Sequence, residues 1–424
     1  MSEYRQRIAD QMLRRRLAGV GAVVIEGPKW CGKSTTAAQQ AGTLLYLDDP
    51  TEIKQNLRMA DINPKALLGG TPPVLIDEWQ LAPQLWDTIR FEVDCRKKPG
   101  QFILTGSAVP AKTDDIHHSG AGRFAWLTMR PMSLYESGDS TGEVSLAKLF
   151  KTPENILGFN KLNLEEVAFL ICRGGWPYAT LLEQELALDQ VKYYYDAVTR
   201  SDVSRVDDVR RNTEMVKRLM RSYSRHQGTQ ATISTIVEDI RVFDEEAADA
   251  KTISSYIEVL KKIFVIEDAL AWNPNLRSKS AIRTSDTRYF VDPSIAVAAL
   301  GLGPTDLVND LNTMGLLFET LCVRDLRVFA DALDGQVYHF RDKTGLECDA
   351  VVHLRNGHFG LIEIKLGGDK GIEEGAENLK SLAKRIDTNR MKSPSFLMVL
   401  TATGKFAYRR EDDVYVVPIG CLKD

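Results

Sequence analysis

The chain has 424 residues, of which 44% are hydrophobic and 26% charged, and its formal net charge at pH 7 is -4. This length predicts two to four domains with real cores, and the weakly acidic balance excludes a uniformly basic nucleic-acid-binding protein. No apolar run approaches the ~20 residues of a membrane span, and the charged N-terminus lacks the apolar stretch of a signal peptide. Six cysteines without a C-x-x-C pair argue against a zinc site or a disulfide framework, so we expect a cytoplasmic protein.

A phosphate-binding loop is predicted near the N-terminus. After an expected helix over residues 1–20, the short strand Val23–Glu26 leads into the run GPKWCGKS, and the helix-forming run Lys33–Ala41 follows. This is G-x-x-x-x-G-K-[ST] between a strand and a helix, the setting in which the pattern binds nucleotide phosphates. Lys33 would contact the β- and γ-phosphates, and Ser34 would bind Mg²⁺. The expected ATP-binding residues are Gly27, Cys31, Gly32, Lys33, Ser34 and Thr35.

Two adjacent carboxylates follow a buried strand further along. Residues 43–49 predict the second strand, and Val74–Ile76 predicts a third strand that ends in Asp77 and Glu78. A hydrolysing P-loop needs one carboxylate on the metal and another that orients the attacking water. We therefore assign Asp77 to Mg²⁺ and Glu78 to the water.

The fourth and fifth strands complete an α/β core over residues 1–150. Phe102–Thr105 and Phe124–Thr128 are the strands, and their alternation with helices predicts a parallel sheet.

Two polar residues beside these strands are further candidates. Ser107 is the expected γ-phosphate sensor, and Thr105 is the second choice. Arg123, on a glycine-rich loop, is placed to reach the γ-phosphate of a neighbouring subunit. A local salt bridge of Arg123 is the alternative.

Helices dominate the middle of the chain. Residues 151–202 predict a helical lid on the α/β domain, with strands absent. Over residues 203–303, three helices and a basic hairpin suggest a winged helix, in which the third helix would contact DNA. A purely structural helical domain is the alternative. The candidate DNA-binding residues are Lys261, Lys262, Arg277, Lys279 and Arg283.

The remainder, residues 304–424, predicts an α+β domain with a second acidic site. Asp349, Glu363 and Lys365 form the D…E-x-K set of restriction-type nucleases, and Glu319 on the preceding helix is a plausible fourth member. Asp349 and Glu363 would hold Mg²⁺ against the scissile phosphate, while Lys365 orients water or stabilises charge. A solvated charged strand face is the alternative.

Turn chemistry gives this site a structural test. A two-residue Asn356-Gly357 turn would pair Ala350 with Glu363 and place Asp349 on the opposite face. A three-residue loop that starts at Arg355, with Gly357 left-handed, pairs Asp349 with Glu363 instead. We predict the three-residue loop.

Several runs resemble a known family. The runs GPKWCGKST, LDDP, PPVLIDEWQ, FILTGS, GAGRF and RPMSLYE, with RGGWP and YYYDAVTRSDV further on, resemble AAA-type ATPases found as single genes across bacteria and archaea. Such chains join an AAA+ module to a winged helix and a nuclease-like domain, which here resembles the archaeal Holliday-junction resolvase type. Members usually carry arginine at the position of Lys29. By this resemblance Arg123 acts in trans, which implies a dimer or a ring such as a hexamer.

Together these features predict a multidomain α/β chain that uses ATP and Mg²⁺. Its expected function is ATP hydrolysis coupled to binding or remodelling of DNA, with branched DNA preferred. One alternative is a nucleotide switch that gates a protein partner. Another is a metal-dependent DNA endonuclease that ATP only regulates.

Overall fold

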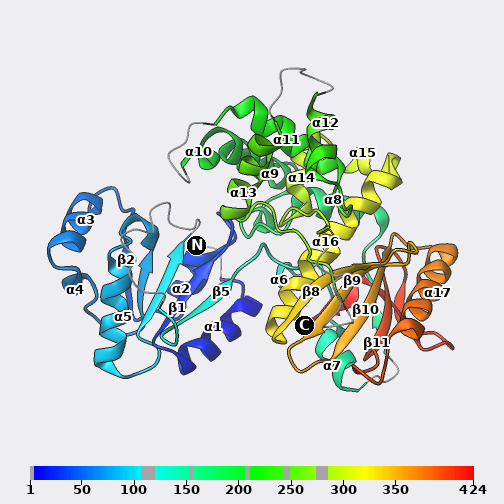
Figure 1. The fold of residues 1–424 in the computed structure, drawn as a ribbon, viewed down its shortest axis with the longest axis horizontal. Coiled ribbons are helices and arrows are strands. Elements are labelled where there is room, and N and C mark those ends of the chain that lie inside the picture. The colour runs from blue at the N-terminus through cyan, green and yellow to red at the C-terminus, as the bar shows by residue number, and fades with distance from the viewer. Residues whose placement is uncertain (1–3, 107–119, 153–155, 206–210, 242–248, 274–284) are drawn as a thin grey trace. The chain divides into compact units, whose positions relative to one another are not determined.

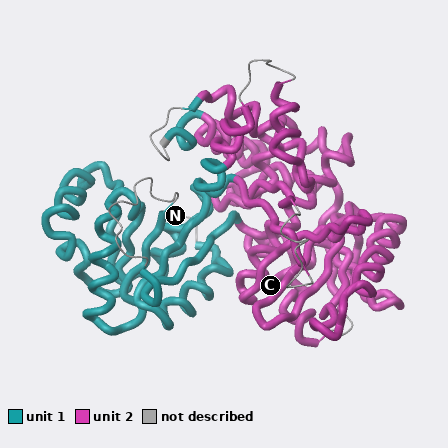
Figure 2. Tube along the Cα trace, in the orientation of Figure 1, with its two compact units in different colours: residues 1–131, 200–211, 258–265 teal, residues 132–199, 212–257, 266–424 magenta. Residues whose placement is uncertain are grey.

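The computed structural model describes residues 4–106, 120–152, 156–205, 211–241, 249–273 and 285–424. Contacts divide the chain into two compact units (Figure 2). Unit 1 comprises residues 1–131, 200–211 and 258–265, and unit 2 comprises residues 132–199, 212–257 and 266–424. Each unit therefore combines segments that are far apart in the sequence. The finer division into four domains stays a prediction.

Unit 1 contains a five-stranded parallel sheet, as the alternation of strands and helices predicted. Across the sheet the strands follow the order β2-β3-β4-β1-β5 (Figure 1). The strands are β1 (Ala22–Glu26), β2 (Thr43–Tyr46), β3 (Val74–Asp77), β4 (Phe102–Gly106) and β5 (Phe124–Thr128). Strand β4 thus lies between β1, which leads into the phosphate-binding loop, and β3, which ends in Asp77.

Helices cover both faces of this sheet. Successive residues of a strand point to opposite faces, and those of β1 enter two separate apolar clusters. One cluster includes residues of α3 and α5, and the other includes residues of α1 and α2. The helices are α1 (Ile8–Gly19), α2 (Lys33–Ala38), α3 (Ile53–Ile62), α4 (Pro64–Leu67) and α5 (Leu85–Arg96).

Unit 2 begins with a helical part. Helix α14 (Pro293–Leu300) lies at its centre and contacts α8, α9, α11 and α16. The sequence did not reveal α14, because its residues are apolar on nearly every side and show no amphipathic period. The other helices are α6 (Leu134–Ser137), α7 (Leu146–Lys151), α8 (Leu164–Arg173), α9 (Gln184–Ala197), α11 (Thr213–Arg225), α12 (Ile233–Arg241), α15 (Pro304–Asn309), α16 (Leu311–Ala332) and α17 (Asp369–Arg385).

Three helices lie at, or directly after, the points where the chain passes from unit 2 into unit 1. The π-helix Val198–Asp202 and α13 (Ala250–Lys262) each continue from unit 2 into unit 1, and α10 (Val203–Arg205) follows the π-helix.

A seven-stranded mixed sheet forms the rest of unit 2, in the order β7-β12-β13-β11-β10-β9-β8. From α16 to β11 the chain runs helix, strand, hairpin, helix, strand, which is the predicted order. The strands are β7 (Gly158–Phe159), β8 (Gly335–Arg341), β9 (Glu347–Leu354), β10 (Phe359–Lys365), β11 (Phe396–Thr401), β12 (Phe406–Arg409) and β13 (Val414–Pro418). A separate pair joins β6 (Val144–Ser145) to β14 (Leu422–Lys423).

The segment expected to be wholly helical after residue 151 contains a strand. Its residues Gly158 and Phe159 pair with β12 at the edge of the seven-stranded sheet. Two residues are too few to show an alternating pattern, so this strand was not predictable from periodicity.

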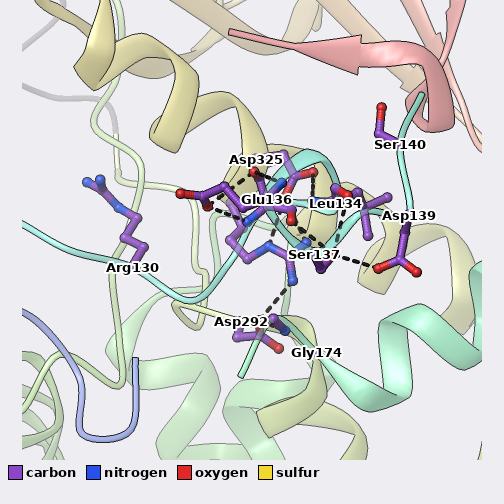
Figure 3. A network of polar contacts seen from close by, with 12 residues as sticks. Arg130, Leu134, Glu136, Ser137, Asp139, Ser140, Gly174, Asp292 and Asp325 are labelled. Atoms are coloured by element: carbon purple, nitrogen blue, oxygen red, sulfur yellow. Dashed lines mark hydrogen bonds and ion pairs between the residues drawn. The ribbon is translucent and has the colours of Figure 1, made fainter. Parts of the chain in front are cut away.

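A buried ion-pair network joins separate parts of unit 2 (Figure 3). The guanidinium of Arg324 lies 2.9 Å from Asp292 Oδ2 and 2.7 Å from Asp325 Oδ1, and all three side chains are at most 1% exposed. Asp325 also accepts a hydrogen bond from the Leu134 N–H, and Asp292 accepts one from the Gly175 N–H, each at 2.9 Å. The runs RPMSLYE and RGGWP are therefore both anchored by this network.

Two expectations from composition can be compared with the structure. Within the described residues, no helix is long and apolar enough to cross a membrane. All six cysteines are among the described residues, and each is a free thiol.

Candidate functional site

The loop between β1 and α2 has the backbone shape of a phosphate-binding loop. Gly27 and Gly32 have φ angles of 145° and 97°, values that a residue with a side chain rarely adopts. A Cβ at Gly27 would lie 2.0 Å from the Met129 carbonyl oxygen, so only glycine fits there. The two glycines of the motif are thus required by geometry at both ends of the loop.

Lys33 points back into this loop. Its Nζ donates hydrogen bonds to the carbonyl oxygens of Gly27 at 2.9 Å and Pro28 at 2.8 Å, and the side chain is buried. The ammonium is therefore held inside the loop, where it can meet the phosphates that the loop would bind.

The start of α2 and the carboxyl ends of β3 and β4 bring together the candidate metal site. The Ser34 hydroxyl donates to Asp77 Oδ1 at 2.7 Å, and the Thr105 hydroxyl donates to the same oxygen. Asp77 and Thr105 are register partners on β3 and β4, which explains their contact. The oxygens of Ser34 and Asp77 fit Mg²⁺, which prefers hard oxygen ligands. Ser107, the first-choice sensor, lies outside the described residues, and the choice between it and Thr105 stays a prediction.

Glu78 follows Asp77 at the same edge of the sheet. Its backbone is left-handed, with φ 53°, and its carboxylate accepts a hydrogen bond from the Gln80 side chain. A non-glycine residue in this conformation is uncommon and is found more often at functional sites. Glu78 is half-buried, and its role in orienting a water molecule stays a prediction.

Residues outside the motif also hold the loop, and the sequence did not single them out. Arg7 Nη1 donates to the Cys31 carbonyl oxygen at 2.8 Å, and the Tyr4 hydroxyl lies 3.0 Å from Thr36 Oγ1. Both residues belong to an N-terminal segment whose charged composition resembles an ordinary helix surface. Arg7 differs from an ordinary surface arginine because it is buried, and burial is visible only in the structure.

Arg123 lies at the far edge of the unit 1 sheet. It precedes β5, and its carbonyl oxygen accepts from the N–H of Ala22 at the start of β1. The phosphate-binding loop follows the opposite end of β1. Arg123 Nε lies 2.9 Å from Asp94 Oδ1, and hydrogen bonding to this guanidinium lowers the pKa of Asp94. The local salt bridge considered as the alternative is therefore present.

The candidate DNA-binding residues are only partly described. Lys261 and Lys262 end α13, with Lys262 exposed and Lys261 half-buried. The remaining three, Arg277, Lys279 and Arg283, lie outside the described residues. Their role in DNA binding stays a prediction.

In unit 2 the acidic residues predicted from the D…E-x-K set come together. Ile362 pairs with Ala350, and extending this antiparallel register by one residue places Glu363 opposite Asp349. The Gly357 N–H bonds to the Leu354 carbonyl, and Gly357 has φ 81°. This is the register predicted from a three-residue loop.

Lys365 lies between the two carboxylates. Its Nζ is 2.8 Å from Glu363 Oε2 and 3.6 Å from Asp349 Oδ2. Asn378 of α17 donates to Glu363 Oε1 at 2.7 Å, and Asp349 Oδ2 accepts from the Ile364 N–H at 2.7 Å. The hydroxyl of Tyr289 donates to Glu319. Each acidic side chain is thus held by a partner.

The electrostatics show how strongly these groups interact. Burial, followed by the charge of Asp349, raises the pKa of Glu363 to about 7 and that of Glu319 well above its usual value. Burial opposes the charge of Lys365, but Asp349 and Glu363 outweigh it and raise the lysine pKa. Asp349 and Glu363 supply oxygen ligands suited to Mg²⁺. Among the described residues, no group of three or more Asp, Glu, His or Cys side chains is arranged to hold a metal.

Comparison with protein families matches the region that contains the first of these sites. A family model described as "AAA domain" matches residues 20–138, which include the loop, Asp77, Glu78 and Arg123. Residues 20–138 are thus similar to an AAA domain, which supports a P-loop ATPase. This match supports ATP binding and hydrolysis by the domain, and the roles of the single loop residues stay predictions. Two further models, described as domain of unknown function DUF8612 and DUF4143, match residues 164–306 and 314–422 of this ATPase.

Similar proteins cover most of the ATPase chain. The uncharacterized proteins Mb2031c of Mycobacterium bovis and Rv2008c of Mycobacterium tuberculosis are each 23% identical over 365 residues, which is 85% of this chain and 74% of theirs. The Walker-type ATPase PABY2304 of Pyrococcus abyssi is 14% identical, with 68% of this chain and 94% of that chain covered and a TM-score of 0.42. A STAND protein with a tetratricopeptide repeat sensor, PH0952 of Pyrococcus horikoshii, is 14% identical over 75% of this chain and 49% of its own, with a TM-score of 0.23.

Proposed function

We propose that this AAA-type ATPase couples Mg²⁺-dependent ATP hydrolysis to the binding or remodelling of DNA, with branched, Holliday-junction-like DNA as the preferred form. The observation that carries the DNA part is the cluster of Asp349, Glu363 and Lys365, with Glu319 nearby, on the C-terminal sheet. Carboxylates that hold Mg²⁺ beside a lysine are suited to contact with a phosphodiester.

At the ATPase site, residues from three elements share the chemistry. Lys33 would bind the β- and γ-phosphates, while Ser34 and Asp77 would hold the Mg²⁺ that neutralises them. Glu78 would orient the attacking water, and Thr105 would hold Asp77 in place. The contacts of Ser34 and Thr105 with a single oxygen of Asp77 support this division of roles.

The helices that precede the C-terminal sheet support a DNA partner through their order. Helices α11, α12 and α13 are followed by the antiparallel bridges Ile266–Phe290 and Ala269–Thr287. Three helices and then an antiparallel pair is the order of elements in a winged helix. We assign DNA contacts to Lys261 and Lys262, and to Arg277, Lys279 and Arg283 between the bridging segments.

The test is the ATPase rate of the full chain without DNA and with duplex, single-stranded and four-way-junction DNA. We expect the four-way junction to raise the rate most, and Lys33→Ala to remove hydrolysis with every DNA. Filter binding of the same DNAs by the Lys33→Ala variant separates DNA contact from turnover. Absence of both stimulation and binding with all three DNAs would overturn the DNA proposal and leave the ATPase in place.

A metal-dependent endonuclease regulated by ATP is the second candidate, because the ammonium of Lys365 lies within 3.6 Å of both carboxylates. Strand cleavage on a denaturing gel in the same reactions would support it. Such cleavage should be lost in Glu363→Gln, which keeps the shape of the side chain but removes the charge.

A further inference from the structure

Lys29, inside the phosphate-binding loop, is held by a carboxylate from a distant part of unit 1. Its Nζ lies 2.5 Å from Asp202 Oδ1, although the two residues are 173 positions apart. The Asp202 side chain is only 9% exposed, whereas that of Lys29 is 42% exposed. The carboxylate is thus the fixed partner, and the lysine reaches it from the loop.

The loop has an uncommon backbone conformation beside this ion pair. Next to Lys29, Trp30 has φ 65°, a left-handed conformation that is uncommon for a residue with a side chain. On the other side of Trp30, the Cys31 carbonyl accepts from Arg7 at 2.8 Å. Asp202 and Arg7 therefore hold the strained turn from both sides.

Asp202 itself is firmly placed. It is the last residue of the π-helix Val198–Asp202, and π-turns are rare and often found at functional sites. The segment that follows is fixed by Arg211, whose Nη1 donates to the Val203 carbonyl at 3.0 Å and whose backbone N–H donates to Ser204 Oγ at 3.2 Å. A carboxylate on such a support can restrain the loop rather than merely follow it.

We infer that Asp202 is a positioning residue of the nucleotide site, which acts through Lys29 to keep the loop in its phosphate-binding conformation. This rests on the nucleotide binding of the proposed function. A loop that is already ordered loses less conformational freedom when phosphate binds. Loss of the ion pair should therefore weaken nucleotide binding and raise KM for ATP, with a much smaller effect on kcat.

The experiment measures the Kd for Mg·ADP by calorimetry on the full chain. We expect Lys29→Met and Asp202→Asn each to weaken binding about tenfold, and the double variant to be no worse than either single variant. Exchange of the two charges, Lys29→Asp with Asp202→Lys, should recover most of the affinity, and Lys29→Arg should keep it. Lys192→Met is the matched control, because it breaks the exposed pair of Lys192 with Asp189 on α9, at 2.8 Å, and should leave Kd unchanged.

The outcomes separate this inference from the proposed function. Unchanged affinity in both single variants, or additive losses in the double variant, would overturn the inference. A purely structural role would lower the melting temperature of the single variants without a matching recovery of Kd in the charge exchange. A wild-type chain that binds Mg·ADP but does not hydrolyse ATP would overturn the proposed function, while the Kd comparison would still decide the role of Asp202.

Discussion

At the scale of single residues, Thr105 is the contact at the ATPase site that most needs a test. Its hydroxyl and that of Ser34 both donate to Oδ1 of Asp77. Thr105→Val keeps the shape of the side chain and removes this donor. We expect kcat to fall about 100-fold with little change in KM for ATP, because the donor acts on the carboxylate of the hydrolysing centre and not on bound nucleotide. Steady-state ATPase assays over a range of ATP concentrations measure both constants.

The matched control for this substitution is Thr43→Val at the start of β2. The hydroxyl of Thr43 bonds to the Thr71 carbonyl at 3.1 Å, and Thr43 is opposite Val74, at the end of β3 away from Asp77. Thr43→Val should leave kcat unchanged. A Thr105→Val enzyme with wild-type kcat would return the sensor assignment to Ser107.

The residues of the candidate site were predictable where they lie close together in the sequence. Gly27, Gly32, Lys33 and Ser34 fall within eight positions, so one short pattern contains them. Asp202 could not be assigned, because its partner is 173 positions away and an aspartate on a helix usually faces solvent. The contact of Thr105 with Asp77 was not predictable for a similar reason, since the sequence does not show which residue of β4 is opposite Asp77.

At the scale of elements, the residues of a turn predicted more of the fold than hydrophobic periodicity did. The Asn356-Gly357 signal, read as a three-residue loop, gave the register that brings Asp349 opposite Glu363. The order of strands in the unit 1 sheet had no such local signal. Strand β4 is inserted between β1 and β3, and that insertion depends on packing of whole βα units and not on any single turn.

The buried network of unit 2 gives the prediction at this scale. Arg324 is 1% exposed and pairs with Asp292 and Asp325, which are equally buried. Arg324→Met would leave two carboxylates in the interior without their cation. Removal of one partner from a buried ion pair typically costs about 3–5 kcal/mol, so we expect a loss of this size in the free energy of unfolding of unit 2. Urea unfolding followed by tryptophan fluorescence and circular dichroism measures it.

A surface pair of the same unit provides the comparison. Arg341 lies 3.7 Å from Glu347, and both side chains are about half exposed. Arg341→Met should change the free energy of unfolding by less than about 1 kcal/mol, because water already screens this pair. Equal effects of Arg324→Met and Arg341→Met would show that the buried network contributes no more than a surface contact.

At the scale of the whole molecule, the sequence does not show which segments belong to which of the two units. Residues 200–211 and 258–265 return to unit 1 after long excursions through unit 2. Composition and turn signals mark changes along the chain, but they do not state which unit a returning segment will join. The predicted domain boundaries near residues 150 and 203 follow such signals and stay predictions.

The position of Arg123 leads to a prediction about assembly. Arg123 adjoins the start of β1, and the phosphate-binding loop follows its end, so five residues of strand, about 16 Å, separate the two along the sheet. The guanidinium therefore does not face the phosphates of its own loop. Both side chains of its pair with Asp94 are exposed to solvent. Arg123 can therefore exchange Asp94 for another partner at little cost in free energy.

We therefore expect Arg123 to act on the site of a neighbouring subunit, and mixed variants can reveal this. Arg123→Ala alone and Glu78→Gln alone should each lose most ATPase activity, since one lacks the arginine and the other lacks the carboxylate that orients water. When the two proteins are mixed, an intact site of the Arg123→Ala chain can receive Arg123 from a Glu78→Gln neighbour, so activity should reappear and depend on total protein concentration. If Arg123 served its own site, every chain in the mixture would still lack one essential group, and the mixture would stay as inactive as its components.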